Sequence, residues 1–199
     1  MRGVRGVRAS VALVAAASML LLVGCTSGSL EDQYASGSDQ GYISGDGSTV
    51  ELPADQRTDP VEFEGVDENG NTISSADYLG KVYVVNFWWA GCTPCRVEAP
   101  DLADLAAEYE DVPFLGVNTS DGPDTARTFA EQFGIEYPSI IDAKLVTVQL
   151  AFADSGMPTN AVPSTLVIDR EGRVAGRISG LISDPSILAA MIDRVLEEQ

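Results

Sequence analysis

The feature that most constrains this 199-residue chain is a pair of cysteines, Cys92 and Cys95, placed directly after a hydrophobic run. Residues 82–88 are nearly all apolar and are rich in β-branched and aromatic side chains, which is typical of a strand buried inside a sheet. A helical pattern follows over 93–109, with Pro94 at an early position where a missing N–H is tolerated. The sequence therefore predicts a strand, a short loop and a helix whose N-terminus carries two thiols.

The position of these two thiols predicts redox chemistry. Free N–H groups and the positive end of the helix dipole stabilise a thiolate at a helix N-terminus, which makes Cys92 the expected nucleophile. Cys95 lies one turn further and is placed to resolve a mixed disulfide formed at Cys92. The alternative is a binding module with a structural disulfide, which is uncommon across two intervening residues at a helix start.

Glu98 is a candidate acid of the same site. It follows Cys95 by three residues, so the helix places both side chains on neighbouring positions of one face. A partly buried carboxylate there would exchange protons with that thiol. The alternatives are an exposed helix glutamate or an ion-pair partner for Arg96. Pro100, two residues further, is expected to kink the helix.

Two tryptophans and a later proline are candidates for the substrate surface. Strand alternation places at least one of Trp88 and Trp89 in the core and leaves the other free to contact a substrate. Pro163 precedes a predicted strand. A cis bond there would let the backbone of Val162 pair with an extended peptide, whereas a simple turn proline is the more common case.

The remaining pattern predicts one α/β domain over 60–199, with a mixed central sheet covered by helices on both faces. An N-terminal hairpin extension is expected within this range, around the turn Asn69-Gly70. The connection 138–161 is long and includes a short helical pattern. The expected strands are 61–64, 71–73, 114–118, 164–169 and 173–178, and the further expected helices are 124–133, 145–152 and 185–197.

Residues 1–24 have the pattern of a bacterial lipoprotein signal peptide. Three arginines precede an apolar run at 11–23, which is too short for a normal membrane-spanning helix and ends in Leu-Val-Gly-Cys at Cys25. We therefore expect lipidation of Cys25 and an extracytoplasmic protein anchored to the membrane by lipid. A plain signal anchor, or a secretory peptide cut elsewhere, is the alternative. Residues 25–59 are rich in Gly and Ser and are expected to form a flexible tether, with an arm packed on the domain left open for 41–52.

Composition excludes several function classes. The chain has 12 Lys and Arg against 30 Asp and Glu, for a net charge of −18, and it has no histidine. A protein this acidic repels phosphate backbones, so nucleic acid is not an expected partner. The lack of histidine removes histidine bases, Ser-His-Asp triads and most zinc sites. We expect no metal, and no cofactor besides a redox-active Cys92–Cys95 disulfide.

From about residue 60 to the end, the chain resembles the thioredoxin superfamily and, within it, the TlpA/ResA/CcmG-like membrane-anchored thiol-disulfide oxidoreductases. The resemblance implies a thioredoxin fold, with Cys92 as nucleophile and Cys95 as resolving thiol. It also implies a cis-proline at Pro163 and an acid at Glu98, as in the CxxCxxE pattern of the ResA-like branch. The chain departs from the family at Gly91, where a tryptophan is usual.

The resemblance also implies partners. The family often serves cytochrome c maturation, keeping haem-binding cysteines reduced with electrons from a membrane thiol carrier of the CcdA/DsbD type. We therefore expect a monomeric reductase acting on disulfide- or thiol-containing extracytoplasmic proteins. The alternative is an oxidase that donates its disulfide to secreted proteins, because the direction depends on the reduction potential. A peroxidase is disfavoured, since the peroxidatic cysteine of peroxiredoxins lies outside a CxxC.

Overall fold

The computed structural model describes residues 49–155 and 161–198. The predicted signal peptide at 1–24, the lipidation site Cys25 and the tether up to residue 48 lie outside the described residues. Within the part of the chain that is described, no helix has both the length and the apolar character needed to cross a membrane.

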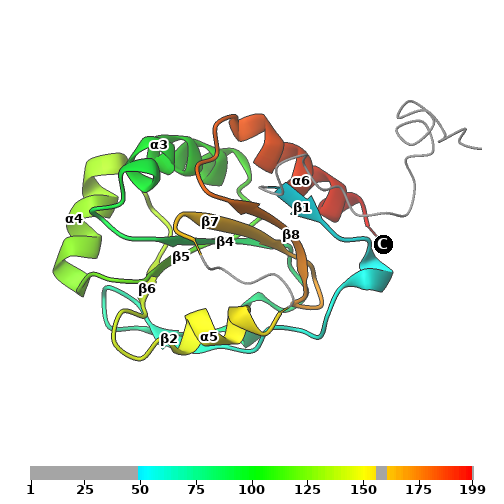
Figure 1. The fold of residues 1–199 in the computed structure, drawn as a ribbon, viewed down its shortest axis with the longest axis horizontal. Coiled ribbons are helices and arrows are strands. Elements are labelled where there is room, and N and C mark those ends of the chain that lie inside the picture. The colour runs from blue at the N-terminus through cyan, green and yellow to red at the C-terminus, as the bar shows by residue number, and fades with distance from the viewer. Residues whose placement is uncertain (1–48, 156–160, 199) are drawn as a thin grey trace, which may run out of the picture. The chain divides into compact units, whose positions relative to one another are not determined.

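A six-stranded mixed sheet forms the centre of the fold (Figure 1). The strand order is β1-β8-β7-β4-β5-β6. The neighbours β4, β5 and β6 run parallel, and the other neighbours run antiparallel. The strands of this sheet are β1 (Thr49–Glu51), β4 (Tyr83–Trp88), β5 (Phe114–Asn118), β6 (Ser139–Ile141), β7 (Ser164–Ile168) and β8 (Val174–Ser179).

A separate hairpin and several helices complete the fold. The hairpin pairs β2 (Glu64–Val66) with β3 (Thr72–Ser74), in register from Glu64↔Ser74 to Val66↔Thr72. The α-helices are α3 (Thr93–Glu108), α4 (Pro123–Phe133), α5 (Thr147–Ala153) and α6 (Pro185–Glu197), and the short 3-10 helices are η1 (Ala54–Gln56) and η2 (Ser75–Tyr78).

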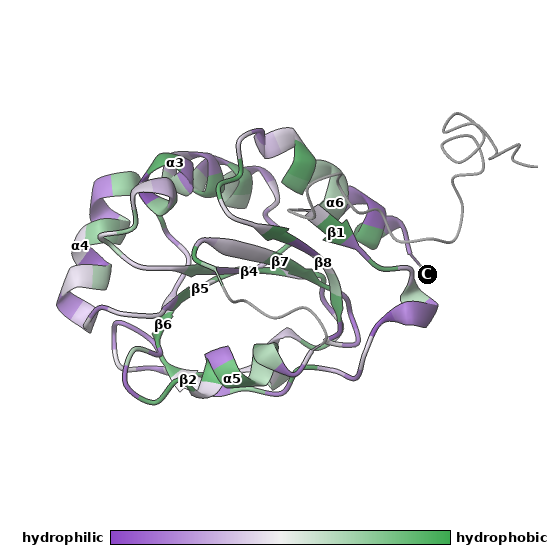
Figure 2. Ribbon diagram, viewed as in Figure 1, coloured by the Kyte–Doolittle hydropathy of each residue, from purple (hydrophilic) through white to green (hydrophobic). Residues whose placement is uncertain are grey.

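The sheet is covered on both faces, as predicted. Val84 of β4 packs in a core with residues of α3 and α6, whereas Val85 and Phe87 pack on the opposite face against the hairpin and α5. On that face, Phe152 of α5 lies with its ring centroid 5.4 Å from the ring of Phe87. Figure 1 shows α3 and α6 on one side of the sheet and α5 with β2 on the other. Figure 2 shows the strands as largely hydrophobic and the helices as two-sided, which is the pattern this layering requires.

The N-terminal arm differs from the expectation. Residues 49–59 were expected to belong to a flexible tether, with a packed arm left open for 41–52. Strand β1 pairs with β8 at the edge of the sheet, which agrees with the packed arm over the described residues 49–52 and not with the tether. Beyond β1, the guanidinium of Arg57 lies 2.9 Å from Asp169 and 2.6 Å from Glu198. The boundary at residue 60 is therefore too late. The composition of 49–59 does not indicate this packing, because a three-residue edge strand has no detectable period. The partners of Arg57 are also more than 100 residues away in the chain.

Smaller differences concern short elements. The hairpin strands lie at Glu64–Val66 and Thr72–Ser74, slightly later than the expected 61–64 and 71–73. Strand β6 at Ser139–Ile141 was not expected within the connection 138–161. Three residues are too few for an alternating pattern to be recognised.

Candidate active site

Cys92 and Cys95 form a disulfide at the start of α3. The sulfur–sulfur distance is 2.03 Å, and the two Cα atoms are 5.3 Å apart. Cys92 is the N-cap residue of α3, and its sulfur accepts a hydrogen bond of 3.2 Å from the backbone N–H of Cys95. Pro94 lies in the first helical turn, where it costs no hydrogen bond. Both cysteines are buried, and Cys92 is the more exposed of the two.

The loop before Cys92 is held from several sides. The backbone N–H of Cys92 donates to the carbonyl of Trp89 at 3.1 Å, which closes a tight turn. The N–H of Ala90 donates to a carboxylate oxygen of Asp121 at 2.7 Å, and Arg96 donates to the carbonyl of Ala90 at 3.3 Å. Arg96 is thus engaged with this loop and not with Glu98.

Asp121 was missed by the sequence analysis. It lies just after β5, and its carboxylate also accepts from the side chain of Asn118 at 3.0 Å. Since β4 and β5 run parallel, their carboxyl ends lie at one edge of the sheet, and the loops that follow them meet there. The signal available in the sequence was the polar pair Asn118 and Asp121, three residues apart at the end of the predicted strand 114–118.

Glu98 lies behind the disulfide and is only 1% exposed. One carboxylate oxygen accepts from the side-chain amide of Asn86 at 3.1 Å, and the other accepts from the backbone N–H of Ile182 at 3.0 Å. Burial, the largest cause, and the charge of Asp101 raise the pKa of Glu98, these two hydrogen bonds lower it, and the net result is a pKa of about 7. Near neutral pH the carboxyl group of Glu98 therefore exchanges between its protonated and ionised forms.

A narrow cavity of about 10 Å³ lies beside Cys95, on the side lined by Asn86, Ala99 and Tyr137. This volume is close to that of a single water molecule. Burial and the charge of Glu98 both raise the pKa of Tyr137 above its ordinary range, so its hydroxyl stays protonated. The buried thiol position thus has contact with at most a water-sized space, which agrees with the shielding expected for Cys95.

The peptide bond between Val162 and Pro163 is cis, as the resemblance implied. The carbonyl oxygen of Val162 lies 3.8 Å from the sulfur of Cys92. The carbonyl of Pro163 accepts from the N–H of Gly180 at 2.8 Å, which brings the loop after β8 against this segment. Residues about 70 positions apart therefore meet at the sulfur of Cys92.

The two tryptophans have different environments. Trp88 is 4% exposed. Its ring centroid lies 4.2 Å from that of Phe129, and its indole N–H donates to Ser139 at 3.2 Å. Trp89 is 37% exposed. One tryptophan is therefore in the core and the other at the surface, as strand alternation predicted, and Trp88 does not present its ring to a substrate.

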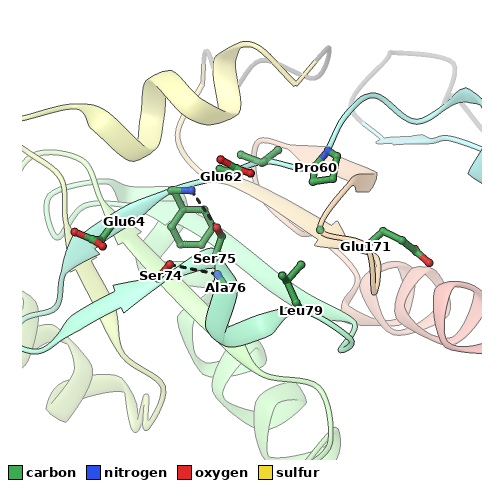
Figure 3. A pocket seen from close by; sticks show the side chains of 11 residues that line it. Pro60, Glu62, Glu64, Ser74, Ser75, Ala76, Leu79 and Glu171 are labelled. Carbon is green, nitrogen blue, oxygen red and sulfur yellow. Dashed lines mark hydrogen bonds between the residues drawn. The ribbon is translucent and has the colours of Figure 1, made fainter.

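A separate groove of about 650 Å³ lies along the hairpin side of the molecule (Figure 3). Its rim carries Glu62, Glu64 and Glu171, and Leu79 faces it. None of its lining residues belongs to the loop 89–91, to α3 or to the cis-proline segment. Within the described ranges, no group of three or more Cys, Asp and Glu side chains is arranged to hold a metal ion.

Comparison with known proteins identifies the family. The AhpC/TSA family matches residues 57–177. The thiol:disulfide interchange protein HelX of Rhodobacter capsulatus is 34% identical over 117 residues, which is 59% of this chain and 62% of HelX. The thiol-disulfide oxidoreductase ResA of Geobacillus kaustophilus is 30% identical over 128 residues, which is 63% of this chain and 70% of ResA.

A solved structure agrees with these relatives. The thiol:disulfide interchange protein of Chlorobium tepidum, a thioredoxin family protein, superposes with a TM-score of 0.63 at 27% identity, over 71% of this chain and 97% of that protein. The predicted thioredoxin-like fold and the resemblance to ResA-like proteins are confirmed. The matched relatives are thiol-disulfide oxidoreductases, and this chain belongs to the AhpC/TSA family.

Proposed function

We propose that this protein is a thiol-disulfide oxidoreductase that reduces protein disulfides outside the cytoplasm. The observation that carries the proposal is the position of the Cys92 sulfur. It lies between the N–H of Cys95 at 3.2 Å and the carbonyl of Val162 at 3.8 Å, with Glu98 buried behind the same helix turn. A purely structural disulfide has no need of a titrating carboxyl group in that place.

The reaction follows from this arrangement. In the dithiol form, the Cys92 thiolate attacks one sulfur of a substrate disulfide and forms a mixed disulfide, and the first substrate thiolate leaves. Cys95 then loses its proton and attacks the Cys92 sulfur, which forms the Cys92–Cys95 disulfide and releases the second substrate thiolate. Glu98 takes up the proton of Cys95 and passes it to the departing substrate thiolate. Two electrons and one proton from an external dithiol then restore the Cys92 thiolate and the Cys95 thiol.

Val162 is proposed to hold the substrate chain. It precedes the cis-proline, and its carbonyl already faces the reactive sulfur. An extended substrate segment would pair with this backbone as an added strand, which sets the substrate sulfur in line with Cys92.

Location and partners are proposed from the relatives and the sequence. HelX and ResA are named for thiol-disulfide interchange and oxidoreduction. With Cys25 lipidated, the domain would be tethered to the membrane, where a thiol carrier of the CcdA/DsbD type would supply electrons. The haem-binding cysteines of cytochrome c are the proposed substrate thiols. The net charge of −18 favours neutral or basic partner proteins.

The redox state of the cysteines in intact cells tests the proposal. Cells are quenched with acid, free thiols are alkylated with a heavy maleimide, and the shift is read on a blot. Two labels, at Cys92 and Cys95, are expected for a reductase. An unlabelled pair that dithiothreitol opens indicates the oxidase instead. A pair that resists dithiothreitol indicates a structural disulfide and refutes both enzymes. A third label would show that Cys25 is not lipidated.

A further inference from the structure

We propose that Trp89 and Gly91 act as a pair, with the indole of Trp89 laid over Gly91 as an apolar platform beside Cys92. The platform would receive a bulky apolar side chain next to the reactive cysteine of a protein substrate. The inference rests on the proposed function and names a determinant of its substrate preference.

The first observation is the contact between the ring and the glycine. A Cβ atom placed on Gly91 would lie 2.1 Å from Cζ3 of the Trp89 ring and 2.9 Å from two further ring atoms. No side chain tolerates such distances, so the ring and any residue larger than glycine exclude each other. Gly91 does not have the positive φ seen at Gly70 or Gly80. The glycine is therefore required by the ring above it and not by the backbone.

The second observation is that the loop cannot easily move to relieve such a clash. Trp88 is fixed in the core by Phe129 and Ser139, which fixes the start of the loop. Ala90 is held at its N–H by Asp121, and the N–H of Cys92 donates to the carbonyl of Trp89. A substitution at position 91 must therefore displace the indole.

The third observation is where the platform lies. The loop that contains Trp89 directly precedes Cys92 in the chain. The carbonyl oxygen of Val162 lies 3.8 Å from the Cys92 sulfur. Leu181, 40% exposed, follows Gly180, whose N–H donates to the carbonyl of Pro163. The ring that covers Gly91 therefore lies over the residue directly before Cys92, and Leu181 follows the residue that contacts the cis-proline segment.

The charged side chains that contact the loop before Cys92, Arg96 and Asp121, are already bound to groups of the protein. This favours an apolar substrate side chain over a cationic one. The Arg96 guanidinium donates to the Ala90 carbonyl and lies 5.1 Å from the ring centroid of Phe133. The Asp121 carboxylate is bound by the N–H of Ala90 and by Asn118. The exposed part of the Trp89 ring therefore offers an apolar surface over the residue before Cys92, and a substrate side chain that covers it would exclude water from that surface.

The test compares substrates that do and do not reach the platform. Peptide disulfides with Leu, Lys or Gly beside the cysteine are reduced under identical conditions, with oxidised glutathione as a small disulfide that lacks a platform residue. In the unaltered protein, kcat/KM is expected to be highest for the Leu peptide. Trp89→Ala should lower that value about tenfold and should lower glutathione disulfide reduction far less. Trp89→Phe should keep most of the preference.

The pairing is tested by a double-mutant cycle. Gly91→Ala alone should lose the Leu preference as Trp89→Ala does, whereas adding Gly91→Ala to Trp89→Ala should cause no further loss. Leu145→Ala removes an exposed apolar side chain outside the site and should change nothing. Thermal unfolding of each variant confirms that the fold is intact.

Three results would overturn the inference. Equal loss on the Leu peptide and on glutathione disulfide would show a general effect on Cys92. Additive effects of the two substitutions would show that the residues act separately, and a preference for the Lys peptide would show the wrong substrate class. If the unaltered protein reduces none of these disulfides, the proposed function itself fails and the inference falls with it.

Discussion

Replacing Glu98 by glutamine should remove a large pH-dependent contribution to stability. The carboxyl group is almost completely buried between α3, β4 and the loop after β8, and its two oxygens accept from Asn86 and Ile182. Burial raises its pKa from 4.5 to about 7. The folded protein therefore binds this proton more tightly than the unfolded chain does.

The sign and size follow from proton linkage. A raised folded-state pKa gives a stabilising contribution that is complete below pH 4.5, decreases as the pH rises, and is lost once the pH exceeds about 7. A difference of roughly 2.5 pKa units corresponds to about 3 kcal/mol at 1.36 kcal/mol per unit. The free energy of unfolding should thus fall by about 3 kcal/mol more between pH 4.5 and pH 8 in the unaltered protein than in Glu98→Gln.

Urea unfolding of the oxidised protein at both pH values measures this difference. Only one of the two terminal atoms of a glutamine side chain accepts hydrogen bonds, so Glu98→Gln loses one of the two bonds. This loss lowers the free energy of unfolding by the same amount at both pH values, so it cancels when they are compared. Asp104→Asn is the matched control, because it removes an exposed carboxylate from the same helix. Parallel pH profiles for Glu98→Gln and the unaltered protein would refute the reasoning, since they would mean that Glu98 is equally ionised in both states.

Three further predictions concern the site and its supports. Cys95→Ser should leave substrate covalently bound to Cys92 and visible on a non-reducing gel, and prompt release would contradict the resolving role. Arg57→Met should lower the free energy of unfolding by about 3 kcal/mol in urea, because Arg57 and Asp169 are 2% and 3% exposed and the carboxylate loses a partner; a change below about 1 kcal/mol would contradict a buried pair. Gly116→Ala should cost about 1–3 kcal/mol, since its Cβ would lie 2.1 Å from the nearest hydroxyl oxygen; an unchanged melting temperature would show that the core can relax there.

The centre of the fold could be predicted because its signals are local. The apolar run that becomes β4 and the helical pattern of α3 adjoin in the chain, and the motif lies at their junction. Helix N-terminal chemistry then places Cys92 without any tertiary information. The longer elements were found for the same reason, since period and capping are properties of a few neighbouring residues.

Other features depend on distant contacts that no local pattern records. Pro163 could be placed beside Cys92 only through resemblance, because its position depends on how β7 packs against β4. The hydrogen bond from Ala90 to Asp121 joins two separate loops, and the one from Ile182 to Glu98 joins the loop after β8 to helix α3. The segment that contains strand β1 and Arg57 was expected to be a tether, because a three-residue strand and one buried cation do not alter the Gly- and Ser-rich composition of residues 25–59.

The loop after β8 joins the two halves of the site. Gly180 donates to the carbonyl of Pro163, and Ile182, two residues later, donates to the carboxylate of Glu98. The same three-residue stretch therefore fixes both the cis-proline segment, which faces the reactive sulfur, and the acid behind the disulfide. Because Glu98 changes its charge near neutral pH, the strength of one of these two bonds changes with protonation while the other does not. One backbone stretch, more than 80 residues after the two cysteines, therefore holds both the proposed substrate-binding segment and the proposed acid.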